Sequence, residues 1–131
     1  MAQRWDTVRP YFERATVAHV ATLMPDGSPH SVPVWVGVEG DEIVFFSIAG
    51  SQKDRNIRAD PRVAFSITHP DNMLSHAAVR GRVVRRIEGD EAMPHVDRIA
   101  RAYTGADYEL RGGLAVFVVE PTRSWSIDYS G

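Results

Sequence analysis

Hydrophobic and polar residues alternate along most of this chain with the two-residue period of β-strands. In Ser31–Val38, valines at every second position point one way, while Ser31, Pro33, Trp35 and Gly37 point the other. Pro33 has no N–H for a strand ladder, so this strand is expected at a sheet edge or a bulge. Further apolar runs predict strands at Val17–Met24, Ile43–Ile48, Val63–Thr68, Ser75–Glu88, Leu114–Glu120 (ended by Pro121) and Ser124–Tyr129.

Helical spacing of apolar residues appears near both ends of the chain. It favours an amphipathic helix over Trp5–Arg14. Pro10 lies inside this segment, so the helix either contains it or begins there. A second helix is expected from Gly89 to about Tyr103, followed by a loop over Thr104–Gly113. Its core stripe is Met93, Val96, Ile99 and Ala100.

A short helix with a defined start and end is predicted from Gln52 to about Ala59. Ser51 is a favourable N-cap, and Asp54 three residues later completes a capping box. The helix is expected to end at Asp60, because the next residue is a proline and helical backbone is disfavoured before proline.

The only lysine of the chain, Lys53, falls in the first turn of this short helix. The helix dipole disfavours a cation there, so a bound anion would account for it. Free backbone N–H groups, the dipole and an ammonium together suit a phosphate. Asn56, one turn on, is expected to face the same way. The alternative is a solvated surface lysine.

Arginines supply all the other fixed positive charge. Arg80, Arg82 and Arg86 fall on one face of Ser75–Glu88, provided that Val84-Arg85 does not shift the register. Such a row is usually a solvated face. The alternative is that it faces an acidic cofactor tail.

Composition limits the classes of function. The 131 residues suit a single domain, 1–131, of mainly β structure with about six strands and two or three helices. A net charge of −2 gives no sign of nucleic-acid binding. The absence of cysteine excludes disulfides and thiolate chemistry. No signal peptide or long apolar run is visible, so a cytoplasmic protein without membrane contact is expected.

The chemical motifs of common enzyme classes are not found. The chain has no phosphate-binding or nucleophile-elbow glycine motif, and its five histidines lack the tight spacing of metal ligands, so no metal site is expected. His30, at the start of the valine-rich strand, is a weak candidate proton donor because histidine titrates near neutrality. Catalytic residues are otherwise unknown.

Three stretches in order carry a resemblance to a known superfamily: DGSPHSVPVW, VFFS and KDRNIRADPRV. They resemble the pyridoxamine 5'-phosphate oxidase-like split β-barrels. The closest resemblance is to the actinobacterial branch that uses the deazaflavin coenzyme F420, which HPDNMLSHAAVRGRVV and IARAYTGADY also resemble. The resemblance covers about Ala15 to Pro121. It implies a Greek-key split barrel and a homodimer with cofactor sites between the subunits.

The resemblance also implies site residues. Ser47, Ile48, Lys53 and Asn56 would hold the cofactor phosphate, and Val32, Pro33, Val34 and Trp35 would lie behind the ring. Relatives often carry a second basic residue just before the lysine. Here Ser51 and Gln52 occupy that place, which leaves Arg55 as the candidate replacement.

The function that the resemblance implies is hydride transfer from reduced F420 to a small conjugated substrate of the enone, quinone or tetrapyrrole type. The first alternative is an FMN-dependent oxidase or reductase. A non-enzymatic alternative is a protein that binds or sequesters the flavin or deazaflavin. A heme-handling split barrel is a further alternative, for which no histidine has an obvious ligand context. Arg55, Arg58, Arg80 and Arg82 are candidates for a groove that holds the acidic tail of F420.

Overall fold

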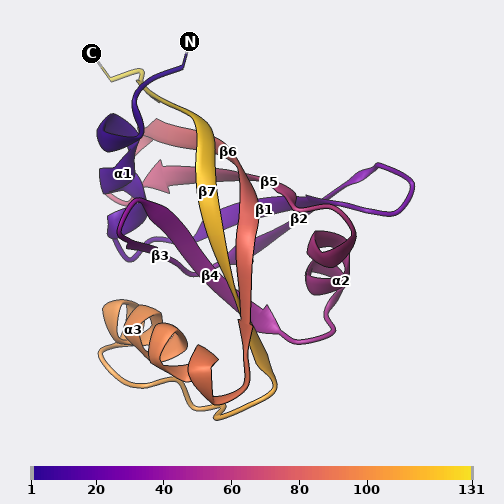
Figure 1. Ribbon diagram of the computed structural model, residues 1–131. Coiled ribbons are helices and arrows are strands. Elements are labelled where there is room, and N and C mark those ends of the chain that lie inside the picture. Colours follow the sequence, from indigo (N-terminus) through magenta and orange to yellow (C-terminus); the bar gives the residue numbers. More distant parts are fainter. Residues whose placement is uncertain (1, 131) are drawn as a thin grey trace.

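The alternating segments pair into one antiparallel sheet in the computed structural model, which describes residues 2–130 (Figure 1). Seven strands follow the order β2-β1-β5-β6-β7-β4-β3. Their bounds are β1 Ala18–Leu23, β2 Pro29–Val34, β3 Val36–Glu39, β4 Glu42–Ile48, β5 Arg62–His69, β6 Asn72–Glu88 and β7 Leu114–Asp128. The helices are α1 Trp5–Glu13, α2 Gln52–Ala59 and α3 Met93–Thr104, with a 3₁₀ turn, η1 Gly89–Ala92, before α3. This mainly β fold confirms the expected class.

The predicted continuous strand Ser31–Val38 is wrong, because the chain bends at Trp35. Residues before the bend form β2, which pairs with β1, and residues after it form β3, which pairs with β4. These two strands are the opposite edges of the sheet. Since one residue joins the two edges, the sheet must curl round on itself into a split barrel. Pro33 lies on an edge strand, as its missing N–H predicted.

The inner face of the curled sheet forms the main core. It contains the valines of the bent segment, of which Val34 and Val36 are buried and Val32 and Val38 partly buried. Phe45, Phe65 and Phe117 meet at its centre, with ring centroids 5.0 to 5.5 Å apart. Helix α1 contributes Val8 and Phe12 to this core, and its Pro10 lies inside the helix.

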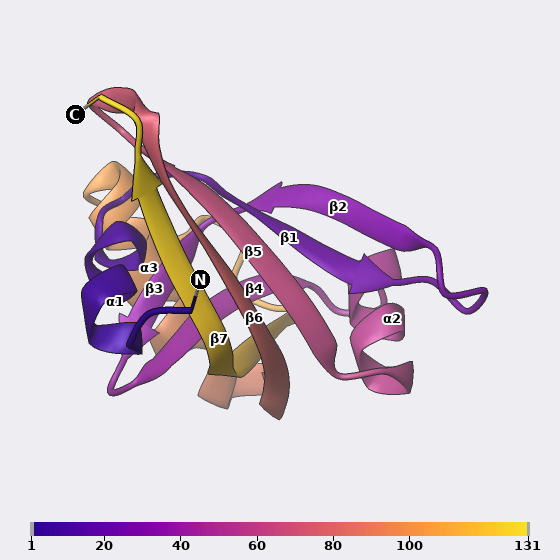
Figure 2. The ribbon, with the colours of Figure 1, turned by 90° about the horizontal axis from the view of Figure 1, so that it is seen from above.

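A second, smaller core lies between α3 and the outer face of β4 and β7. The expected core stripe of α3, which includes Val96 and Ile99, is buried there. Figures 1 and 2 both place α1 and α3 on one side of the molecule and α2 on the other, beside the end of β1 and the start of β2. Helix α2 begins after Ser51 and ends before Asp60, as the sequence predicted.

A register shift in β6 separates the three arginines expected on one face. The shift between Val83 and Arg85 leaves Val84 unpaired, and beyond it Arg86 lies opposite the core residue Phe117. Directly opposite residues of antiparallel strands share a face. Arg86 is therefore on the inner face, whereas Arg80 and Arg82 lie on the outer face, and the expectation of one row is wrong.

The two predicted C-terminal strands are one strand, β7, so Pro121 does not end it. The pairing with β6 shifts between Arg80 and Gly81, and Pro121 lies at this irregularity opposite Gly81. Proline is tolerated at such a bulge because the ladder is already interrupted there. A Cβ on Gly81 would lie 2.6 Å from the carbonyl oxygen of Glu120.

Replacing Gly81 by alanine is therefore expected to destabilise the fold by about 1–3 kcal/mol, the usual effect of overpacking. The new methyl group would also lie 2.8 Å from a methyl carbon of Val119, so both strands would have to move. Gly112→Ala is the control, because a Cβ there meets no atom within 4 Å. Urea unfolding of both variants measures the difference. Equal urea midpoints for the two variants would show that the strands at the β6–β7 bulge can move apart without loss of stability.

Candidate functional site

A pocket of about 390 Å³ brings together several of the residues singled out in the sequence. It opens outside the barrel, where the bend between β2 and β3 lies beside β4 and α2. Its lining consists of Val17, Pro33, Val34, Trp35, Phe46, Lys53 and Tyr108. The expected ring wall and the expected phosphate lysine thus share one hollow, although they are far apart in sequence.

Aromatic side chains fix the wall of this pocket. Trp35 stacks on Tyr103 of α3, with centroids 4.9 Å apart and planes 11° apart, and meets Phe46 and Tyr108 edge-on. The Tyr103 hydroxyl accepts a bond from the Val36 N–H at 3.0 Å and donates to the carbonyl of Thr16 at 2.7 Å. It thereby satisfies a backbone donor that the bend leaves on the edge of β3.

The loop after α3 is tied down by a buried carboxylate. Asp97 accepts two bonds from the Arg111 guanidinium, at 2.8 and 2.9 Å, and one from the Tyr108 N–H at 3.1 Å. These contacts lower the pKa of Asp97, with the Arg111 bonds as the largest cause. Tyr108 is therefore held at the rim of the pocket by a bidentate ion pair.

Lys53 supplies the positive charge of the pocket. Its ammonium is half-buried, and within residues 2–130 no carboxylate lies at ion-pair distance. Burial lowers the pKa of Lys53 below its ordinary value of 10.5, because desolvation disfavours the charged form. An anion in the pocket would reverse this shift. The structure therefore places an uncompensated cation beside a flat aromatic wall.

Polar groups surround the start of α2 next to Lys53. The buried Ser47 hydroxyl lies 3.0 Å from that of Ser51, which also caps the Asp54 N–H. Arg55 is exposed and donates to the Gly50 carbonyl at 2.6 Å and to Gln52 Oε1 at 2.6 Å. Its guanidinium thus lies over the loop just ahead of Lys53.

Asn56 does not face the same way as Lys53. Its side chain is only 2% exposed and donates to the Thr22 hydroxyl of β1 at 3.0 Å. Its oxygen accepts from Gln52 Nε2 at 2.8 Å. The amide therefore fastens α2 to β1 and orients Gln52, a role that the helical spacing alone did not indicate.

The remaining candidates lie outside the pocket lining. Val32 packs against the main core, and the Ile48 side chain is 61% exposed beside the loop to α2. His30 lies opposite Thr22 on the inner face of β2, and its buried Nδ1 has no hydrogen-bond partner among residues 2–130.

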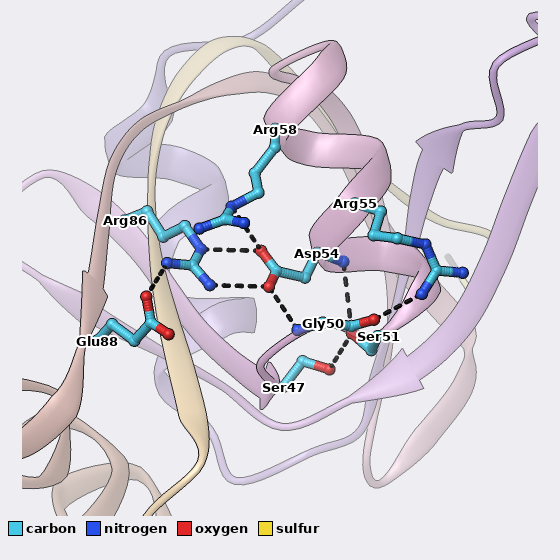
Figure 3. A network of polar contacts seen from close by, with 8 residues as sticks. All are labelled: Ser47, Gly50, Ser51, Asp54, Arg55, Arg58, Arg86 and Glu88. Atoms are coloured by element: carbon cyan, nitrogen blue, oxygen red, sulfur yellow. Dashed lines mark hydrogen bonds and ion pairs between the residues drawn. The ribbon is translucent and has the colours of Figure 1, made fainter.

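A buried ion pair holds the loop that leads into α2 (Figure 3). The Asp54 carboxylate is fully buried and accepts two bonds of 2.8 Å from Arg86 of β6. It also accepts the Gly50 N–H at 2.8 Å. In the predicted capping box the Asp54 side chain would accept the Ser51 N–H, but it bonds the Gly50 N–H instead. Arg86 further pairs with Glu88, and Arg58 lies 3.8 Å from Asp54. The network fixes the polar loop against the sheet.

The same network predicts sensitivity to acid. Bonds from Arg86, and secondarily from the Gly50 N–H, lower the pKa of Asp54 below its ordinary value of 3.8. A carboxyl whose pKa is lowered by folding contributes its full stability above the unfolded pKa and loses it as pH falls toward the folded one. Wild-type stability should therefore decline below about pH 4. Urea unfolding from pH 7 to pH 2.5 measures it, and Asp54→Asn should show a shallower decline.

A larger hollow of about 570 Å³ on the outer face of α3 is a weaker candidate. Its arginines include Arg98, Arg101 and Arg111, and all three are paired with carboxylates. It offers no uncompensated charge comparable to Lys53. The smaller pocket is therefore the candidate site.

Sequence reasoning missed three residues of this pocket: Val17, Phe46 and Tyr108. A signal for Phe46 was present, because it follows the core residue Phe45 and must point to the opposite face of β4. Tyr108 could not be placed, because it comes from a loop whose path depends on the Asp97–Arg111 pair. In the described part of the chain, no helix is long and apolar enough to cross a membrane.

Comparison with protein families gives a direct match. The model described as pyridoxamine 5'-phosphate oxidase matches residues 5–128, nearly the whole chain. No curated protein matches this chain in sequence.

Solved structures share the fold over most of the chain. A protein titled F420 reductase is 30% identical, with 89% of this chain and 94% of that one covered and a TM-score of 0.80. A conserved hypothetical protein from Mycobacterium tuberculosis is 23% identical, with coverages of 99% and 88% and a TM-score of 0.82. A heme binding protein from Mycobacterium smegmatis is 24% identical, with coverages of 100% and 57% and a TM-score of 0.72. The last two show the fold alone. The chain therefore belongs to the pyridoxamine 5'-phosphate oxidase family of split β-barrels, whose fold binds flavin-type cofactors.

Proposed function

We propose that this protein is an oxidoreductase that uses reduced coenzyme F420 as a dissociable hydride donor. The observation that carries the proposal is the half-buried Lys53, which has no carboxylate partner among residues 2–130 and shares a pocket with the flat wall of Pro33 and Trp35. The similarity to the protein titled F420 reductase supports the choice of cofactor.

The pocket fits the parts of such a cofactor that are most easily recognised. Lys53 would bind the phosphate, with the Ser47 and Ser51 hydroxyls, Gln52, and the chain at Ile48 beside it. Asn56 would act by orienting Gln52, and Arg55 would add positive charge at the loop. The segment Val32–Trp35 would lie behind the ring. When bound, the reduced deazaflavin supplies a two-electron hydride.

A second copy of the chain is part of this proposal. A pocket of about 390 Å³ is at the small end of the range for ligand sites and is open on one side. A homodimer with the cofactor between subunits would enclose it. The substrate would be a small conjugated molecule of the enone, quinone or tetrapyrrole type, stacked on the free face of the ring. Solvent would deliver the proton, because His30 lies on the inner face of β2 and does not line the pocket.

FMN is the second candidate cofactor, because Lys53 would serve any phosphate next to a flat ring. The two candidates differ in how the protein behaves during purification. FMN would be retained as a yellow prosthetic group, whereas F420 would dissociate.

Hydride transfer can be tested without knowledge of the natural substrate. Purified protein is mixed with reduced F420 under anaerobic conditions, and quinones and enones are added as acceptors. The expected result is that oxidised F420 forms again only when an acceptor is present. The rate of this oxidation should be lower in Lys53→Gln. Tight F420 binding without transfer to any acceptor would instead favour a cofactor-sequestering protein.

A further inference from the structure

Arg14, directly after helix α1, is a cation without a counter-charge in the described part of the chain. Its Nη1 is buried and has no hydrogen-bond partner among residues 2–130, and no carboxylate in that range lies at ion-pair distance. The end of a helix favours a cation in general, but no carbonyl of these residues accepts Nη1. Because a partly desolvated cation without a partner costs free energy, a bound anion would stabilise it.

A hollow of about 210 Å³ lies beside Arg14, between the end of α1, β3 and α3 (Figure 1). Its lining includes Gly37 of β3 and Ile99 and Ala102 of α3. A Cβ on Gly37 would lie 3.3 Å from Cγ1 of Ile99. The missing side chain therefore lets α3 approach β3 closely and leaves the backbone of β3 bare at the floor of the hollow.

The Arg14 guanidinium is held in place at this hollow. Its Cζ lies 5.6 Å from the centroid of the Tyr11 ring, a cation–π contact, and the Tyr11 hydroxyl lies 2.5 Å from that of Ser75. The backbone is fixed as well, because the Thr16 N–H donates to the Arg14 carbonyl at 2.8 Å and the Thr16 carbonyl accepts the Tyr103 hydroxyl. A pre-positioned side chain loses less entropy when it binds a ligand.

The other charged side chains that line the hollow already have partners. Glu13 pairs with Arg9 at 3.4 Å, and Glu39 pairs with Arg98 and His95. The guanidinium after α1 is therefore the one charge of this lining without a partner in residues 2–130. The two carboxylates would repel a doubly charged anion more strongly than a singly charged one. A single carboxylate fits best, because its two oxygens match the paired N–H donors of a guanidinium.

We propose that this hollow binds a small monocarboxylate, with its carboxylate on Arg14 and its apolar chain against Ala15, Ile99 and Ala102. At about 30 Å³ for each water-sized group, the volume holds about seven non-hydrogen atoms, the size of pentanoate. The hollow shares no lining residue with the Lys53 pocket. It is therefore a second ligand site, and it does not depend on the proposed cofactor.

An NMR titration of ¹⁵N-labelled protein with pentanoate tests the site. The amides of Gly37 and Ala102 should shift saturably, with a dissociation constant of about 1 mM, as expected for one charged contact and a short apolar chain. Pentanamide has the same shape without the charge and should bind at least about 10-fold more weakly. Inorganic phosphate should leave these two amides unshifted.

Two variants test the charge and the hollow separately. Arg14→Gln removes the charge, and Ala102→Leu fills the hollow from an exposed position of α3. Each should weaken pentanoate binding by about 10-fold or more. Ala102→Leu keeps the guanidinium and a good helix former, so it tests the site even if Arg14→Gln lowers stability. Arg4→Gln removes an exposed arginine outside the hollow and should bind pentanoate as the wild type does.

Three results would overturn the site: no saturable shift in the wild type, shifts that persist in both Arg14→Gln and Ala102→Leu, or equal affinity for pentanoate and pentanamide. Because the titration contains no F420, such a result leaves the proposed function untouched. Failure of F420 to bind would likewise leave the carboxylate site intact.

Discussion

Replacement of Arg86 by methionine is expected to lower the free energy of unfolding by about 3–5 kcal/mol, because it leaves a fully buried carboxylate without its main partner. The Asp54 side chain is 0% exposed and Arg86 only 18%, so water cannot take over the two bonds. Arg58 is too distant, at 3.8 Å through one nitrogen, to replace a bidentate pair. Urea unfolding at pH 7 measures the loss.

A neighbouring arginine and a double variant make this prediction specific. Arg85→Met changes an exposed side chain at the β6 bulge and should alter stability by less than about 0.5 kcal/mol. Asp54→Asn combined with Arg86→Met should recover part of the loss, because no buried charge then remains unpaired. If Arg86→Met and Arg85→Met have the same free energy of unfolding, the Asp54–Arg86 pair does not stabilise the loop before α2.

Replacement of Lys53 by glutamine is expected to weaken cofactor binding by about 1.5–3 kcal/mol, or about 10- to 150-fold. This is the usual contribution of a charge-assisted hydrogen bond, and no second ammonium can replace it because Lys53 is the only lysine. The variant should fold as well as the wild type, because the ammonium has no carboxylate partner in the described part of the chain and is partly desolvated in the free protein. Fluorescence titration with F420 measures the affinity.

Two further variants separate charge from geometry at this position. Lys53→Arg keeps the charge and should retain part of the affinity, although its planar group is shaped differently from an ammonium. Arg58→Gln removes a nearby exposed charge that does not line the pocket and should have a smaller effect. Unchanged affinity in Lys53→Gln would show that the phosphate assignment is wrong.

Local signals in the sequence predicted those features of the fold that depend on neighbouring residues. Helix α2 begins and ends where Ser51 and Asp60 predicted, because caps and the residue before proline act within one turn. Alternation placed the valines of Ser31–Val38 correctly on the core face. It also predicted an edge position for Pro33, because a missing donor is a property of the residue itself.

Contacts between residues that are distant in the sequence could not be predicted from these local signals. The backbone just after the bend is held by Tyr103, whose hydroxyl accepts the N–H of Val36, 67 residues earlier in the chain. Arg86 faces inward only because β6 bulges at Val84, and its partner Asp54 is 32 residues away. Pro121 stays within β7 because Gly81 lies opposite. In each case the deciding partner is distant in sequence, so local periodicity pointed elsewhere.

The central claim is that the Lys53 pocket selects a deazaflavin, and a pair of titrations tests it most directly. Cofactor-free protein is titrated separately with F420 and with FMN, and binding is followed by fluorescence. The account predicts micromolar or tighter binding of F420 and weaker binding of FMN. Preference for FMN would contradict it and assign the pocket to an FMN-dependent enzyme, and binding of neither cofactor would contradict the assignment of the pocket itself.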